Sequence, residues 1–258
     1  LILSRSGYTG ELGYELYTPA EEAGPLWEFL LQAGREFGLQ PYGVAAMQSL
    51  RIEKALPLYG NDVNENYTPF HVGLERWIRF DKRGFIGREA LLRVQEQGLH
   101  ERWVGLVLDG VGPAVYPQPI YSISDVATVR ERIHSGSEAA AYRDTLTRSN
   151  QQVGYITSSA RGHTVGQTLA LAYVQSQYAW PGCKLLVDIN SRLTLATVTP
   201  TPFFDPQGVR LRARSRDDAV EAKPPLVPPP SEVPPAPAEV PPPDRSAGDL
   251  RLQNGRCL

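Results

Sequence analysis

Apolar positions along this chain follow a helical period before residue 100 and a strand-like pattern after it. Near the start, apolar side chains recur three or four residues apart, at Leu26, Phe29, Leu30, Ala33 and Phe37. Such spacing places them on one face of a helix, and the next residue, Gly38, is a suitable stop. We therefore predict an amphipathic helix whose Phe and Leu stripe faces a core.

Other local signals predict mixed α/β structure for residues 1 to 98. Thr18-Pro19-Ala20-Glu21 has the form of a capping box with Pro at the first helical position, and Gly24-Pro25 indicates that the helix restarts there. The alternation of residues 14 to 18 predicts a strand, and Leu1-Ile2-Leu3 predicts another. Further helices are expected from Val44 to Lys54 and from Gly87 to Glu96.

Residues 99 to 213 are expected to form a small antiparallel barrel or sandwich. Gly, Pro, Asn and Ser separate its short apolar runs, as is typical of all-β domains. The five predicted strands are Trp103 to Leu108, Gln152 to Ser158, Thr168 to Val174, Lys184 to Ile189 and Leu193 to Thr199. Residues 122 to 150 are polar and interrupt this pattern as a long insertion. The expected fold class is therefore α+β.

The last part of the chain, residues 214 to 258, has a different composition. Positions 224 to 243 hold eleven prolines, and no aromatic residue follows Phe204. Such a segment cannot bury enough apolar surface to offset its conformational entropy. We predict a disordered, partly polyproline-II tail.

Composition excludes several classes of protein. A net charge of −2 gives no basic surface for nucleic acid or anionic membranes. Two cysteines far apart, Cys183 and Cys257, exclude a disulfide scaffold or a Cys-type zinc site and fit a reducing compartment. No apolar run has the length of a membrane-spanning helix. The four histidines show no metal-ligand spacing and no nucleophile partner, so no metal site is predicted.

One segment has the chemistry of a ligand loop. Three glycines spaced three apart, Gly7, Gly10 and Gly13, bracket the carboxylate of Glu11. Glycine lets the backbone approach a ligand, and a carboxylate can accept two parallel hydrogen bonds from one planar donor pair. A guanidinium offers such a pair, and so does the 2-amino/N3–H edge of a pterin. Taken alone, the same segment is also compatible with an ordinary surface turn.

An ordered series of motifs follows this segment. It comprises Met47-Gln48-Ser49-Leu50-Arg51-Ile52-Glu53-Lys54, Leu58-Tyr59-Gly60-Asn61-Asp62, Thr68-Pro69-Phe70, Gly84-Phe85-Ile86-Gly87-Arg88, Gly154-Tyr155-Ile156-Thr157-Ser158-Ser159, Gly162-His163-Thr164-Val165-Gly166 and Pro202-Phe203-Phe204-Asp205-Pro206. Together they resemble the aminomethyltransferase family, the T-protein of the glycine cleavage system. That family also includes the folate-binding parts of sarcosine and dimethylglycine dehydrogenases and oxidases. The resemblance covers roughly residues 4 to 212.

The resemblance implies a fold and a set of folate-binding residues. Residues 1 to 98 would be the C-terminal part of the folate-binding domain, and 99 to 213 the family's C-terminal β-barrel. Glu11 corresponds to the family's folate-binding glutamate, and Arg51 to a ligand-contacting arginine. The alternative for Arg51 is an ion pair with Glu53 or Glu11. Tyr8 and Tyr59 are candidates for ring stacking or hydroxyl contacts with a flat ligand, or for half-buried packing.

Two departures from the family pattern bear on the site. Gln48 stands where the family often has Asp, and Arg76 stands where many members have an aromatic residue. The resemblance also places the family's catalytic aspartate in an N-terminal half that precedes this chain, so no catalytic residue is assigned. Because the chain opens within a strand-like run without Met, we expect it to be the C-terminal part of a longer protein.

The functional prediction is tetrahydrofolate-dependent one-carbon transfer of the aminomethyltransferase type, with a lipoylated carrier protein as a further partner. One alternative is the folate-binding part of a sarcosine or dimethylglycine flavoenzyme, and another is a non-catalytic folate-binding module. The sequence therefore leaves open whether this chain is itself an enzyme. The expected location is the cytoplasm in a bacterium and the mitochondrial matrix in a eukaryote.

Overall fold

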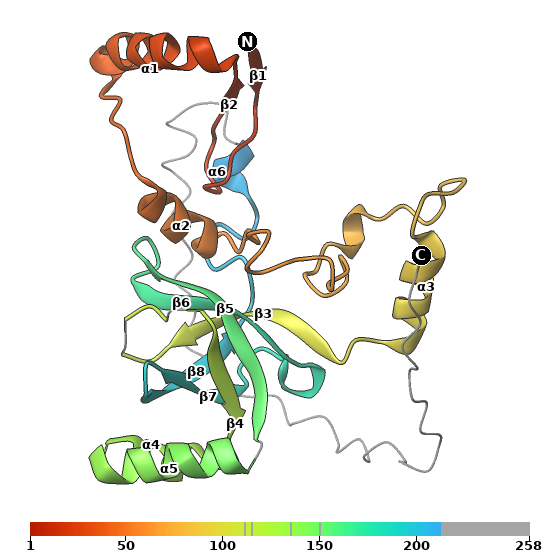
Figure 1. Cartoon of the computed structure of the whole chain (residues 1–258), viewed down its shortest axis with the longest axis vertical. Helices are drawn as coiled ribbons and strands as arrows, with labels where there is room; N and C mark the ends of the chain where they lie inside the picture. Colours follow the sequence, from red (N-terminus) through yellow and green to blue (C-terminus); the bar gives the residue numbers. More distant parts are fainter. Residues whose placement is uncertain (111, 115, 135, 150, 213–258) are drawn as a thin grey trace, which may run out of the picture.

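The computed structural model describes residues 1–110, 112–114, 116–134, 136–149 and 151–212. The predicted tail, residues 214 to 258, lies outside these ranges. The described chain has a closed β-barrel with two helical layers on its outside, and two further segments that project from it (Figure 1). This mixture of helices with an antiparallel barrel confirms the predicted α+β class.

The first segment pairs two short strands and continues into a helix. Strand β1 (Ile2–Ser4) runs antiparallel to β2 (Glu15–Tyr17), and α1 spans Ala20–Gly34 before a short 3-10 turn, η1 (Arg35–Phe37). Gly38 ends this unit in the left-handed region, at φ 71°, as predicted. Two details of the prediction are wrong. The helix continues through Pro25 without a restart, and Thr18 donates to the Glu22 side chain instead of capping the backbone.

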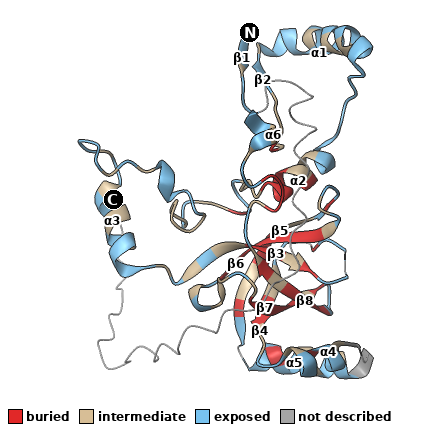
Figure 2. Ribbon diagram, turned by 180° about the vertical axis from the view of Figure 1, so that it is seen from behind, coloured by how far each residue is buried: buried red, intermediate tan, exposed pale blue. Residues whose placement is uncertain are grey.

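The apolar stripe of α1 does not face a core, which corrects the prediction. No residue of α1 is buried, and Phe29 is 65% exposed. Figures 1 and 2 show α1 standing away from the barrel, so the described chain offers its stripe no partner. Periodicity identified the helix correctly, but it cannot show which surface, if any, covers the apolar face.

Helix α2 (Val44–Glu53) packs on the barrel, and it follows the predicted range to within one residue. The next segment contains a 3-10 turn, η2 (Glu75–Trp77), and then α3 (Arg88–Gln97). Helix α3 has no buried residue and projects to one side of the barrel. The predicted start of α3 agrees, since Gly87 precedes it with φ 88°.

The barrel has six antiparallel strands in the order β3-β6-β5-β4-β7-β8, and β8 closes it against β3. Their bounds are Glu101–Leu108 (β3), Gln118–Ser122 (β4), Gln152–Gly162 (β5), Gln167–Gln175 (β6), Lys184–Ile189 (β7) and Arg192–Thr199 (β8). Five of them contain the predicted runs. Sequence reasoning missed β4 because this five-residue strand includes Pro119, which pairs with β5 alone.

Side-chain alternation separates the barrel interior from its two covered outer faces. On β6, Ala170, Ala172 and Val174 join the interior cluster, whereas Leu169 and Leu171 point outward to a cluster that includes Ile52 of α2. On β7, Leu185 and Val187 point inward and Leu186 points outward. Period-two patterning thus builds one core inside the barrel and a second beneath α2 (Figure 2).

Residues 122 to 150, the predicted polar insertion, contain helices α4 (Val126–His134) and α5 (Gly136–Arg148) between β4 and β5. The two helices lie side by side against the end of the barrel opposite α2 (Figure 1). Val129 and Leu146 of these helices pack with Leu186, Leu193 and Leu195. The segment is therefore polar on one face only. After β8 a short turn of helix, α6 (Val209–Arg212), ends the described chain.

Candidate functional site

Helix α2 is anchored to the barrel by polar contacts along its second half. Ser49 donates to the carbonyl of Arg161 at 2.6 Å, and Ile52 fills the apolar contact. The Glu53 carboxylate accepts the backbone N–H groups of Thr164 and Val165 at 2.7 and 3.2 Å. Glu53 therefore accepts the backbone N–H groups of the β5–β6 turn. This contact joins the motif of residues 47 to 54 to the motif of residues 162 to 166.

Arg51 lies at the centre of this contact and is only 2% exposed. Its Nη1 donates to Asp62 Oδ2 at 2.6 Å and to the Leu56 carbonyl at 3.1 Å. Its Nε donates to Gln48 at 2.8 Å, and its Nη2 to Ser158 at 2.7 Å. Four of the five guanidinium N–H groups are thus used within the protein. The ion pairs with Glu53 or Glu11 considered for Arg51 are not formed, because Arg51 pairs with Asp62 instead.

Asp62 is fully buried and accepts hydrogen bonds on both carboxylate oxygens. Oδ2 receives Arg51 and the backbone N–H of Leu58, while Oδ1 receives the Thr157 hydroxyl. A buried carboxylate is tolerable only when it is paired and hydrogen-bonded in this way. The pair fixes the segment of residues 56 to 62 against the end of α2.

A bulge in β5 presents two hydroxyl groups to this pair. The register between β5 and β6 shifts between Ile156 and Ser158, so Thr157 is left out of the regular pairing. Both Thr157 and Ser158 are buried, and they contact Asp62 and Arg51 respectively. Bulges commonly re-aim side chains in this manner. The Thr-Ser dipeptide of the barrel motif therefore holds the ion pair in place.

A tyrosine cluster supports the same loop from the barrel side. Tyr173 donates to the Asp62 carbonyl at 2.9 Å, and the Tyr67 ring stacks on it with centroids 4.0 Å apart. The hydroxyl groups of Tyr67 and Tyr155 are hydrogen-bonded to each other. Burial raises the pKa values of Tyr155 and Tyr173, so both hydroxyl groups stay protonated.

Tyr8 joins the glycine-bracketed segment to the same place. Its hydroxyl donates to the Pro57 carbonyl at 2.6 Å, and it also contacts the Leu56 carbonyl that accepts from Arg51. Burial raises the pKa of Tyr8, while the charge of Arg51 acts in the opposite direction. Tyr59 lies on the loop between Leu58 and Asp62 and is 73% exposed. Three of the four predicted residues therefore meet around residues 56 to 62.

Glu11, the fourth, is 32% exposed at the edge of this region. The preceding Gly10 has φ 74°, and a Cβ there would lie 2.6 Å from Lys54 Cγ, so glycine is required for the turn to sit on α2. Oε2 of Glu11 accepts from Arg210 Nε at 2.9 Å. Within the described residues, Oε1 accepts no hydrogen bond. Sequence reasoning missed Asp62 and Arg210 as partners, although Asp62 lay inside a quoted motif.

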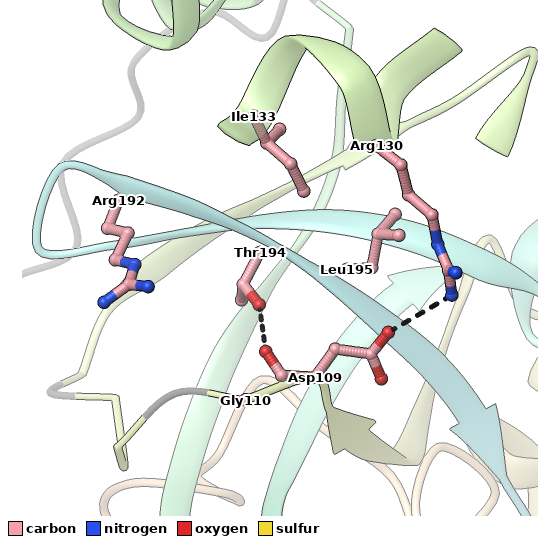
Figure 3. A pocket seen from close by; sticks show the side chains of 7 residues that line it. All are labelled: Asp109, Gly110, Arg130, Ile133, Arg192, Thr194 and Leu195. Carbon is pink, nitrogen blue, oxygen red and sulfur yellow. Dashed lines mark hydrogen bonds and ion pairs between the residues drawn. The ribbon is translucent and has the colours of Figure 1, made fainter. Parts of the chain in front are cut away.

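A cavity of about 450 Å³ lies elsewhere, between α4 and the end of the barrel that carries Asp109 (Figure 3). Arg130 and Arg192 lie at opposite ends of it, and both are exposed. Asp109 lies 3.8 Å from Arg130, and its carbonyl already accepts from the buried Thr194 hydroxyl at 2.7 Å. The cavity therefore lacks the uncommitted buried polar groups that orient a ligand.

The described ranges contain no group of His, Cys, Asp or Glu side chains that could hold a metal ion. His163 is exposed on the β5–β6 turn, and His71 accepts a hydrogen bond from the Thr68 backbone. Among the same residues, no helix has both the length and the apolar character needed to cross a membrane.

Two family models match the chain. Residues 1–82 match the GCVT N-terminal domain, and residues 130–205 match the glycine cleavage T-protein C-terminal barrel domain. The chain belongs to the glycine cleavage T-protein family. The first match includes Glu11 and Arg51, and the second includes most of the barrel.

Comparisons with individual proteins agree. The chain is 36% identical to the aminomethyltransferase of Caldanaerobacter subterraneus subsp. tengcongensis, over 79% of this chain and 47% of that protein. It is also 36% identical to the aminomethyltransferase of Halothermothrix orenii, over 79% of this chain and 50% of that protein. The crystal structure of glycine cleavage system aminomethyltransferase T from Bartonella henselae superposes with a TM-score of 0.64 at 26% identity, over 79% and 50%. The chain spans about half the length of the curated relatives it matches.

Proposed function

We propose that this chain supplies one wall of the folate site of a tetrahydrofolate-dependent aminomethyltransferase. The observation that supports this most is the state of Glu11. One of its oxygens is fixed by Arg210, while the other has acceptor capacity left on a turn of glycines. A pterin edge with two parallel N–H donors matches such a carboxylate.

The other candidate residues divide into two roles. The Tyr59 ring is exposed on the loop of residues 56 to 62, so it is available to stack on a flat ligand. Arg51 and the Tyr8 hydroxyl are already bonded within the protein, so we propose that they mainly hold the site in shape. Within the described residues, one N–H of the buried Arg51 guanidinium makes no hydrogen bond.

In the proposed reaction, the carbon of an aminomethyl group, bound to a sulfur of the lipoyl carrier, forms bonds to two amines of tetrahydrofolate. Its C–S and C–N bonds break, and the carrier thiol and ammonia are released. When bound, tetrahydrofolate supplies the amines that accept the carbon. The residues of this chain bind and orient that acceptor, and orientation is itself a large part of catalysis. We assign the catalytic proton transfers to no residue of this chain.

The proposal is tested by folate titration of the intact gene product, using calorimetry. Glu11→Gln keeps the size of the side chain but loses its charge and one acceptor. Because a charge-assisted hydrogen bond contributes roughly 1.5–3 kcal/mol, affinity should fall about 10- to 150-fold. His163→Ala, on the exposed turn, is the matched control and should bind like the wild type. Equal affinity of wild type and Glu11→Gln would remove the assignment of Glu11.

Turnover separates the alternative functions. A T-protein should release ammonia from an aminomethylated lipoyl carrier in a tetrahydrofolate-dependent reaction. A flavoenzyme component should instead require sarcosine or dimethylglycine together with a flavin. Folate binding without either turnover would indicate a binding module.

A further inference from the structure

The segment after the barrel returns to the glycine-bracketed turn. Beyond β8, Phe203 and Phe204 are buried, and the backbone N–H of Phe204 donates to the Glu53 carbonyl at 3.0 Å. Asp205 follows, buried and in the left-handed region at φ 45°. Its two carboxylate oxygens accept the backbone N–H groups of Val209 and Arg210 at 2.8 and 3.2 Å. The end of the described chain is therefore fixed against α2.

Asp205 also pairs with the end of α2. Lys54 Nζ contacts Asp205 Oδ2 at 2.9 Å and its carbonyl at 2.5 Å, and both side chains are buried. The carbon atoms of the same Lys54 side chain fill the space beside Gly10. The Glu11 turn, the end of α2 and the 203–212 segment thus share one contact.

Arg210 is held in place before it reaches Glu11. Its guanidinium lies over the Phe204 ring, 5.2 Å from the centroid, and its backbone is bonded to Asp205. From this position Nε donates to Glu11 Oε2 at 2.9 Å. Charges therefore alternate in space from Lys54 through Asp205 and Arg210 to Glu11.

We propose that Arg210 is a positioning residue for ligand binding by Glu11. Arg210 occupies one acceptor position of a carboxylate that has about four, so it orients the group without filling it. Its own restraints from Phe204 and Asp205 distinguish it from a mobile arginine that would compete with a ligand for the carboxylate. This inference rests on the proposed folate site, and it assigns the post-barrel segment to that site.

The experiment is a double-mutant cycle on the intact gene product, read by folate titration. Arg210→Ala should weaken binding about fivefold, and Arg210→Lys should weaken it less because the charge is kept. In the Glu11→Gln background, Arg210→Ala should have no further effect, because Arg210 acts through the carboxylate. Arg212→Ala is the matched control, since among the described residues the Arg212 side chain bonds only to the Gln207 carbonyl, and it should bind normally.

Each other outcome is decisive. Equal or tighter binding by Arg210→Ala overturns the positioning role, and the tighter case identifies a competitor. An equal loss in both backgrounds also overturns it, because a purely structural effect would not depend on Glu11. If the wild type binds no folate, the proposed function fails and this inference fails with it, so the two failures are distinguishable.

Discussion

Two substitutions of Asp62 should show how much its charge and its hydrogen bonds each contribute to the free energy of unfolding. In Asp62→Asn, the amide oxygen can face Arg51 and the Leu58 N–H, and the NH₂ group can face Thr157. Thr157 can accept that bond, because its own proton can go to the Leu171 carbonyl 3.0 Å away. The bonds to Arg51, Leu58 and Thr157 are then kept, and the losses are the compensation of the buried guanidinium and an acceptor for the second amide N–H.

The structure sets the size of this effect. Leaving one charge of a buried pair without its partner costs about 3–5 kcal/mol. Because Asp62→Asn keeps its acceptor for Arg51, we expect the lower end, about 3 kcal/mol. Asp62→Ala also leaves the Arg51 and Leu58 N–H donors without this acceptor, and each buried unsatisfied donor costs about 1–3 kcal/mol, so its loss should be clearly larger.

Urea unfolding followed by tryptophan fluorescence measures both variants. Trp103 is a suitable reporter because its indole N–H donates to Thr157 at 3.3 Å, next to the site. The matched control is Asp81→Asn, which removes a carboxylate from an exposed ion pair with Arg79 and should unfold at nearly the same urea concentration as the wild type. If Asp62→Asn lost less than about 0.5 kcal/mol, the reasoning on the buried pair would be wrong.

Three further predictions concern stability. Burial alone would raise the pKa of Asp205, but its bonds with Lys54 and with backbone N–H groups together outweigh burial and lower that pKa. The resulting stabilisation is present above the unfolded pKa and is lost as pH falls through the folded pKa. Lys54→Met should therefore flatten the loss of stability below about pH 4, as seen in acid-unfolding curves. Burial raises the pKa of Asp188, which costs stability above the folded pKa, so Asp188→Asn should raise the melting temperature at pH 7 and leave it unchanged near pH 3. A Cβ at residue 154 would lie 2.1 Å from the Tyr173 carbonyl oxygen, so Gly154→Ala should cost about 3 kcal/mol or more by urea titration, whereas Gly84→Ala, with open space around it, should be neutral.

Sequence patterns identified the elements of the barrel better than they identified contacts. Strands such as β7 carry period-two apolar side chains because one face meets the interior, and that pattern is local. The strand β4 is short and contains Pro119, so it lacks the pattern. Its place in the barrel is decided by pairing with β5 and β7, which are distant in sequence.

The candidate site shows the same limit. Glu11 and Arg51 stood out because their residue types and neighbouring motifs are distinctive. Arg210 reaches Glu11 only because the fold brings the segment after the barrel back to the glycine-bracketed turn, and Asp62 reaches Arg51 through the path of the loop that follows α2. The stripe of α1 was correctly assigned to a helix face, but a period of 3.6 carries no information about what lies opposite it.

Closure of the barrel between its first and last strands has a consequence for biosynthesis. Gly105 of β3 pairs with Thr199 of β8, and α2 finds its polar anchors only when β5 has formed. Such long-range pairing makes folding slow, and at about 5–20 residues per second the ribosome delivers β8 seconds after β3. During that interval the apolar faces of α2, β3 and β6 stay uncovered, so we expect the nascent chain to depend on chaperones until Thr199 has emerged. A messenger truncated before that codon should yield an aggregating product rather than a smaller folded domain.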